Sequence, residues 1–271
     1  MKVDSFFKAA PYKSVSEDAI LINERVKVYG VFDGATPLTP FKDENNMNGA
    51  YLASNIFKDY FSRLYQENLS LVEGIQAANR MLRDRMEKSM VNQEKYEQLW
   101  STCAAIIKFE NDGKISYAQL GDCMIIAEYQ NGVIKALTRD TVKGISYRAK
   151  AWREEQRKQG VTVPDEDFYQ DITQQRIFNR SLANKPHGYT VANGREEAVH
   201  FIQQGQVNIS EIKALLMITD GLFHPDYLLE ETFKMIQKSG VSSYSIELEQ
   251  FERRNNLRSD DKSGIMIRLV N

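Results

Sequence analysis

The chain has 271 residues, of which 42% are hydrophobic and 27% are charged, and its net charge is −2. This composition is typical of a soluble globular protein, long enough for one large domain or two small ones. The charge gives no reason to expect nucleic acid or an anionic membrane as the main partner. No stretch has the length of a signal-peptide core or a membrane span, so we expect a cytoplasmic protein.

The chain contains two cysteines, Cys103 and Cys123, and each lies in an apolar, strand-like run. A cysteine in such surroundings behaves as a small hydrophobic residue. We therefore expect two buried free thiols and neither a disulfide nor a cysteine metal site.

The first third of the chain predicts two strands followed by two helices. Apolar runs over residues 19–22 and 28–34 have the length and residue types of buried strands. After a loop with two prolines, apolar residues recur at helical spacing over residues 47–65, which predicts an amphipathic helix. A second helical pattern spans residues 70–100 and begins with Ser70 placed in a capping box.

The middle of the chain changes character twice. Residues 101–138 form short apolar or alternating runs separated by NDG, GD and NG, the pattern of an antiparallel meander. Residues 139–194 are polar, which predicts an inserted, flap-like helical or loop subdomain within a single domain of residues 1–271. We expect the basic residues of this insert to cover a solvated helix face in preference to meeting an anionic substrate. They include Arg148, Lys150, Arg153, Arg157 and Lys158.

The last third returns to strands, over residues 198–207 and 214–221. Two helices are expected over residues 225–240 and 243–255, the first with proline at its start and glycine at its end. A final strand is expected over residues 265–270. Because strands and helices occur in blocks, the fold class is α+β with largely antiparallel sheets.

Acidic residues lie at the edges of four predicted strands. Asp33 and Asp220 each end an apolar run and precede a glycine, a pair that taken singly predicts a hairpin turn. The pairs Asp260-Asp261 and Glu17-Asp18 each lead into an apolar run. Four such sites indicate one shared cluster, in which hard divalent cations would offset the repulsion between carboxylates.

Six short motifs extend this pattern. In chain order, EDA, VFDG, WSTCAAI, GDC, ITDG and DDKSGIMI resemble the signature motifs of the metal-dependent protein phosphatases of type 2C, the PPM family. They keep the family's order across residues 13–267, so the resemblance covers nearly the whole chain. It implies an α-β-β-α sandwich of two mostly antiparallel sheets flanked by helix pairs. It also implies two Mg²⁺ or Mn²⁺ ions between the sheets, with a weaker third site in many members.

The resemblance implies a set of metal ligands. Asp33 would bridge the two ions, and the carbonyl oxygen of Gly34 would be a further ligand. Asp220 and Asp260 would complete the shell of one ion. Glu17 would bind the other ion, mainly through water.

Other motif residues would act around these ligands. Asp122, together with Asp220, would resemble the weaker third site, and Asp18 would accept hydrogen bonds from metal-bound water. Ser101 and Thr102 would serve mainly in packing. Cys123 stands where the family usually has serine.

The sequence departs from the family pattern at two places. Lys13 stands where the family usually has an arginine that binds the substrate phosphate, and a lysine lacks the bidentate fork, so we expect weaker or less oriented phosphate binding. Ala35-Thr36 stand where a histidine or methionine and then Gly-Gly usually follow Asp-Gly, so the histidine proposed as general acid in eukaryotic members is absent. His224 lies near the expected centre, where we favour packing at a helix entry or solvent exposure over a role as proton donor.

The resemblance implies hydrolysis of phosphoserine and phosphothreonine on proteins by a water or hydroxide that bridges two divalent metal ions. This chemistry needs no protein nucleophile. Two alternatives stay open: a pseudophosphatase that acts as a regulatory binding module, and a hydrolase of small phosphorylated molecules. The expected partner is a phosphorylated protein, and a monomer is favoured.

Overall fold

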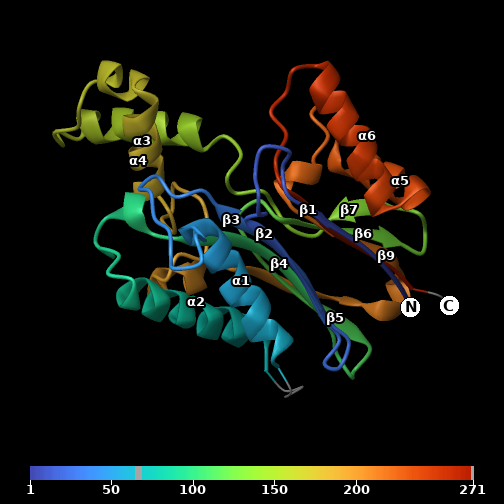
Figure 1. Ribbon diagram of the computed structural model, residues 1–271. Helices are drawn as coiled ribbons and strands as arrows, with labels where there is room; N and C mark the ends of the chain where they lie inside the picture. Colours follow the sequence, from blue (N-terminus) through green and yellow to red (C-terminus); the bar gives the residue numbers. More distant parts are fainter. Residues whose placement is uncertain (65–68, 270–271) are drawn as a thin grey trace.

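The computed structural model describes residues 1–64 and 69–269, whose strands form two antiparallel sheets packed face to face (Figure 1). One sheet contains, in spatial order, β1 (Lys2–Lys8), β10 (Lys262–Arg268), β9 (Ile212–Ile218), β6 (Met124–Tyr129) and β7 (Ile134–Ala136). The other contains β2 (Asp18–Asn23), β3 (Val28–Ala35), β4 (Ser101–Phe109), β5 (Lys114–Leu120) and β8 (Gln203–Asn208).

A pair of helices covers the outer face of each sheet (Figure 1). The helices α1 (Gly49–Ser62) and α2 (Leu71–Lys88) pack on the β2-to-β8 sheet, and α5 (Leu229–Ser239) and α6 (Val241–Arg254) pack on the β1-to-β7 sheet. Successive side chains along a strand point to opposite faces of the sheet. Val31 therefore faces the core between the sheets, and Phe32 faces the α1–α2 layer. The predicted α-β-β-α sandwich is confirmed.

Helix α2 begins as predicted and ends early. Ser70 and Glu73 form the predicted capping box. The helix ends at Lys88 and does not continue toward Trp100, because Met90 adopts a left-handed φ of +55° and the amide of Val91 donates to the carbonyl of Met86. This is the geometry that closes a helix. The apolar residues that extended the helical pattern pack instead on the end of the helix and on the loop before β4.

The predicted meander is wrong in one respect, because its strands divide between the two sheets. β4 and β5 pair in one sheet, whereas β6 and β7 pair in the other. The change of sheet falls at Gly121-Asp122, where Gly121 has a φ of +87° and a Cβ would lie 2.1 Å from Cys103 Sγ. A turn signal in the sequence gives the position of this break but does not say which sheet the next strand joins.

Two further elements differ from the predictions. Strand β1 was not predicted, because its sequence KVDSFFK shows little alternation; it is an edge strand paired only with β10. The strand expected over residues 198–207 begins only at Gln203, since Glu196–Phe201 forms the 3-10 helix η3. No helix in the described part of the chain is long and apolar enough to cross a membrane.

The segment between β7 and β8 contains α3 (Ile145–Lys158), the 3-10 helix η2 (Glu166–Gln170) and α4 (Ile172–Ser181), which project beyond the sheets (Figure 1). The expected solvated basic face is wrong for Arg153, which is 2% exposed. Its guanidinium donates to both oxygens of Glu166, at 2.9 and 2.6 Å, and stacks on the ring of Tyr169 at 3.9 Å. Hydrogen bonding from Arg153 lowers the pKa of Glu166 to about 2. An ion pair therefore forms the core of this segment.

Replacing Glu166 by glutamine is expected to loosen α3 and α4 locally. The buried Arg153 guanidinium would lose its anionic partner, at a cost of about 2 kcal/mol. Hydrogen exchange at the amides of both helices should rise, while exchange in the two sheets stays unchanged. Glu154→Gln, which removes the same charge from an exposed position of α3, is the matched control. Equal exchange in the two variants would contradict the prediction.

Candidate active site

A cavity of about 500 Å³ opens where the two sheets meet beneath α4. Seven of the eight site residues predicted from the sequence line it: Lys13, Glu17, Asp33, Gly34, Asp122, Asp220 and Asp260. The eighth, Asp18, lies behind the cavity wall, where its carboxylate accepts a hydrogen bond from Thr219 Oγ1 at 2.9 Å. Both sheets contribute, since Asp33 belongs to β3 and Asp220 follows β9 in the 3-10 helix η5 (Asp220–Leu222).

The buried carboxyl groups of this cavity repel one another. Burial and the negative charges of Asp220, Asp18 and Asp122 raise the pKa of Asp33 well above its ordinary value. Burial and the charge of Asp260 raise the pKa of Asp220, whose carboxyl group is hydrogen-bonded to that of Asp33. Burial and the charge of Asp220 raise the pKa of Asp122 to about 7. At neutral pH this cluster therefore needs protons or cations to offset its charge.

The donor set fits a hard divalent cation by its chemistry. All the acidic side chains that line the cavity offer carboxylate oxygens as metal ligands. One of these oxygens, Asp122 Oδ1, is buried without a hydrogen-bond partner. Within residues 1–64 and 69–269, however, no three Asp, Glu, His or Cys side chains are already grouped as a coordination shell. The charges and atom types thus suit a cation, while the side chains would have to move closer together to coordinate one.

Lys13 is engaged by carboxylates. Its ammonium group lies 2.7 Å from Glu17 Oε2, 2.9 Å from Asp261 Oδ2 and 3.4 Å from Asp260 Oδ1. Burial opposes the charged form, but hydrogen bonds and charges from Glu17 and Asp261 outweigh it and raise the pKa of Lys13 above its ordinary value. The ammonium group thus serves as a counter-ion of the acidic rim, which differs from the phosphate contact expected from the sequence.

Asp261 organises the rim, a role that the sequence reasoning missed. Its carboxylate accepts hydrogen bonds from the amides of Ala10 and Glu17, both at 2.7 Å. These bonds hold residues 10–17 against the start of β10 and place Glu17 at the cavity. The acidic doublet before the last strand was the available signal, and only its first member was assigned a role.

The glycines after Asp33 and Asp220 permit close backbone contact, and neither forms a hairpin turn: Gly34 lies in β3 and Gly221 lies in η5. Asp33-Gly34 lies inside β3, so the hairpin-turn interpretation is wrong there. A Cβ on Gly34 would lie 2.3 Å from the carbonyl oxygen of Ala50, and one on Gly221 would lie 1.8 Å from that of Asp261. Neither glycine has a left-handed φ. Both Asp-Gly motifs therefore mark places where only glycine fits against another backbone.

Other predicted residues have structural surroundings. Cys103 and Cys123 are buried free thiols, as predicted. The hydroxyl of Thr102 donates to the carbonyl of Asp33 at 2.9 Å. His224 does not line the cavity; it stacks on Tyr227 with ring centroids 4.1 Å apart and its Nδ1 accepts from the amide of Asp226. Of the two interpretations favoured from the sequence, packing at the helix entry describes His224 and solvent exposure does not, since the residue is buried.

Three arginines at the cavity were missed by the sequence reasoning: Arg176, Arg180 and Arg258. Arg176 and Arg180 lie one turn apart on α4. No family motif lies in this segment, so only its general basic character pointed to them.

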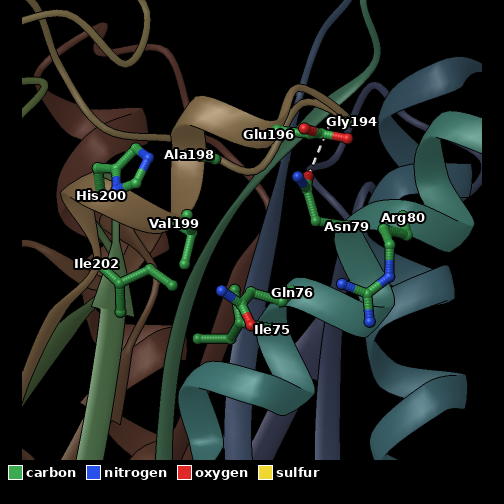
Figure 2. Close-up of a pocket in the computed structure, with 10 residues that line it drawn as sticks. All are labelled: Ile75, Gln76, Asn79, Arg80, Gly194, Glu196, Ala198, Val199, His200 and Ile202. Atoms are coloured by element: carbon green, nitrogen blue, oxygen red, sulfur yellow. Dashed lines mark hydrogen bonds between the residues drawn. The ribbon is translucent and has the colours of Figure 1, made fainter.

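A second cavity, of about 340 Å³, lies between α2 and η3 (Figure 2). Asn79 on its wall is fully engaged, since its Oδ1 accepts from the amide of Gly194 and its Nδ2 donates to the carbonyl of Arg195, both at 2.8 Å. Glu196 is the one carboxylate among the lining residues described. This cavity has no acidic cluster and does not resemble the site between the sheets.

The fold agrees with comparisons to known proteins. The sequence matches the family Protein phosphatase 2C over residues 13–258, and the chain belongs to that family. It is accordingly a phosphatase. Comparison with curated proteins found no match.

Solved structures with a similar fold include bacterial phosphatases. The serine/threonine phosphatase Stp1 of Staphylococcus aureus is 18% identical and aligns over 100% of this chain and 95% of its own, with a TM-score of 0.62. PstP/Ppp of Mycobacterium tuberculosis is 14% identical, with coverage of 100% and 99% and a TM-score of 0.62. A PstP catalytic domain in complex with two manganese ions is 14% identical, with coverage of 100% and 98% and a TM-score of 0.60. At these identities the likeness supports the shared fold.

Proposed function

We propose that this chain removes phosphoryl groups from phosphoserine and phosphothreonine side chains of proteins, and that it requires two Mg²⁺ or Mn²⁺ ions. The observation that carries this proposal is the convergence of Asp33, Asp122 and Asp220 from both sheets on one cavity, where their repulsion calls for cations. Membership of the family supports the same reaction.

The ligands would be those implied by the motifs. Asp33, Asp220 and Asp260 would hold one ion, and Asp33 and Glu17 the other, with the carbonyl oxygen of Gly34 as a further ligand. Asp122 with Asp220 would provide a weaker third site. Bound cations of this kind lower the pKa of a shared water and offset charge on the phosphoryl oxygens.

The surrounding residues would keep this geometry. The Thr102 hydroxyl fixes the carbonyl of Asp33, and Thr219 orients the Asp18 carboxylate, which would accept hydrogen bonds from water. Glu17 is held by the hydroxyl of Thr36 at 2.9 Å and by the side-chain amide of Asn48. The apolar side of the cavity, formed by Val142, Ile145 and Val191, would limit access of bulk water.

The test is hydrolysis of p-nitrophenyl phosphate and of matched phosphoserine, phosphothreonine and phosphotyrosine peptides by the purified protein. We expect turnover of the small ester and of the first two peptides with Mn²⁺ or Mg²⁺, and none with EDTA. Turnover of small esters without turnover of any peptide would favour a small-molecule hydrolase. No turnover by folded protein with either metal would favour a regulatory binding module.

A further inference from the structure

The cavity holds four cationic side chains, and their partners differ. Lys13 is neutralised by Glu17, Asp260 and Asp261. Arg258 is exposed at the rim, where its Nε donates to the hydroxyl of Tyr12 at 3.0 Å and its guanidinium lies over the Tyr12 ring. The remaining two, Arg176 and Arg180, come from α4 and line the cavity together with the carboxylates.

Arg180 is fixed in place by neutral groups. Its Nη1 donates to Ser101 Oγ at 2.8 Å, and its Nη2 donates to the carbonyl oxygen of Thr36 at 3.0 Å. The Tyr189 hydroxyl is also within hydrogen-bonding reach of this guanidinium. Among the ion pairs formed by the described residues, none includes Arg180. Its charge is thus oriented but not neutralised by the protein.

These contacts place Arg180 at the end of β3 that follows Asp33-Gly34. Thr36 follows the end of β3, and Ser101 begins β4 opposite Ala35 in the strand register. The guanidinium therefore bridges the two strand ends that flank Asp33-Gly34. A guanidinium has five N–H donors, so two or three bonds to the protein leave donors for a further acceptor.

We propose that Arg180 binds the phosphoryl group of the substrate, the role that the sequence pattern assigns to position 13. This inference rests on the proposed phosphatase function. An arginine matches phosphate oxygens with parallel N–H groups, whereas the ammonium group of Lys13 is already shared among three carboxylates. Arg176, one turn away, adds positive charge at the cavity mouth without a fixed contact to β3 or β4.

The packing of the inserted segment explains how Arg180 can hold a set position. Phe178, two residues before it on α4, lies 4.8 Å from the buried Arg153 guanidinium and 5.2 Å from the Tyr169 ring. Ala192 at the other end of the segment pairs with Thr102. The segment is attached to β4 close to the site, so the guanidinium is preorganised for an anion before substrate arrives.

The test compares Arg180→Met, Arg180→Lys and Lys13→Met with the wild type and with Arg80→Met, which removes an exposed arginine from α2. Calorimetry measures the dissociation constant of inorganic phosphate in the presence of Mg²⁺ and, separately, that of Mn²⁺. Kinetics with p-nitrophenyl phosphate give KM and kcat.

We expect Arg180→Met to weaken phosphate binding and reduce kcat/KM by about 10- to 100-fold without changing Mn²⁺ affinity. The phosphate affinity and kcat/KM of Arg180→Lys should lie between those of the wild type and Arg180→Met, since lysine keeps the positive charge and loses the paired N–H groups of the guanidinium. Lys13→Met should tighten Mn²⁺ binding, because it frees three carboxylates, and should weaken phosphate binding less than Arg180→Met. Arg80→Met should match the wild type.

The inference is overturned if Arg180→Met binds phosphate as tightly as Arg80→Met, or if Lys13→Met weakens phosphate binding more than Arg180→Met. Absence of phosphate binding by the wild type would overturn it as well. Failure of the proposed function looks different: the wild type would lack turnover, while the dependence of phosphate binding on Arg180 would still be measured.

Discussion

Replacing Asp220 by asparagine is expected to reduce metal-dependent turnover about 1,000-fold and, in metal-free protein near neutral pH, to raise the melting temperature. Asp220 would be a ligand of the proposed metal centre, and loss of the charge stabilisation that such a centre provides, several kcal/mol, corresponds to a rate loss of this size. Without metal, the same carboxylate is a source of repulsion toward Asp33 and Asp122.

The direction of the pH dependence follows from the raised pKa values. Burial and the charge of Asp220 raise the pKa of Asp122 from 3.8 to about 7, so the folded state binds this proton more tightly than the unfolded state. The contribution of Asp122 to stability is therefore fully present below its unfolded pKa and is lost as the pH rises toward 7, by about 4 kcal/mol for a shift of this size. Glu166, whose pKa is lowered to about 2, contributes stability that is lost only as the pH falls below its ordinary pKa.

Thermal unfolding in EDTA at pH 5, 6 and 7.5 measures this effect. The wild type should lose melting temperature across the series, and Mn²⁺ should restore it at pH 7.5. The melting temperature of Asp220→Asn should fall less with rising pH and should rise less on addition of Mn²⁺. Asp84→Asn, an exposed position on α2, serves as the control and should follow the wild type. Asp220→Asn protein that keeps metal-dependent turnover, or melts below the wild type at pH 7.5 in EDTA, would refute the assignment.

Replacing Gly221 by alanine is expected to destabilise the fold by at least about 3 kcal/mol. The new Cβ would lie 1.8 Å from the carbonyl oxygen of Asp261, and neither backbone can move without disturbing the start of β10. For a chain of this size the melting temperature should fall by about 6–12 °C. Differential scanning calorimetry in EDTA measures the loss without interference from metal binding.

The variant Gly132→Ala is a control that distinguishes the effect of close contact on stability from the effect of backbone conformation. Gly132 has a φ of +82°, but a Cβ there would meet no atom within 4 Å. The variant should cost about 1 kcal/mol, the penalty of a left-handed conformation alone. Similar losses for Gly132→Ala and Gly221→Ala would argue against close backbone contact as the reason for glycine at position 221.

The layers of the fold could be predicted from the sequence because local patterns determine them. The capping box at Ser70 and the buried strand that contains Asp33 depend on residues a few positions apart. The division of the meander at Gly121 could not be predicted, since a turn signal does not say which sheet the next strand joins. The edge strand β1 was missed for a similar reason, because its pairing with β10 depends on residues more than 250 positions away.

The acidic part of the site could be predicted, whereas its cationic part could not. Asp33 and Asp220 lie in short motifs whose spacing can be read along the chain. Arg180 lies in a polar segment among other basic residues, and only the packing of α4 distinguishes it from Arg157, which pairs with Glu166. The contact between Lys13 and Asp261 likewise depends on two segments that are far apart in the sequence.

The hydrogen bonds that Asp261 accepts from Ala10 and Glu17 also bear on when the site forms during biosynthesis. A ribosome must release residues 260–268 before β10 can insert between β1 and β9 and fix the segment that carries Lys13 and Glu17. Contacts of such long sequence separation form slowly and late. A nascent chain would therefore carry a partly built sandwich whose acidic rim is not yet fixed, and catalytic competence would arise only after residues 260–268 have left the ribosome.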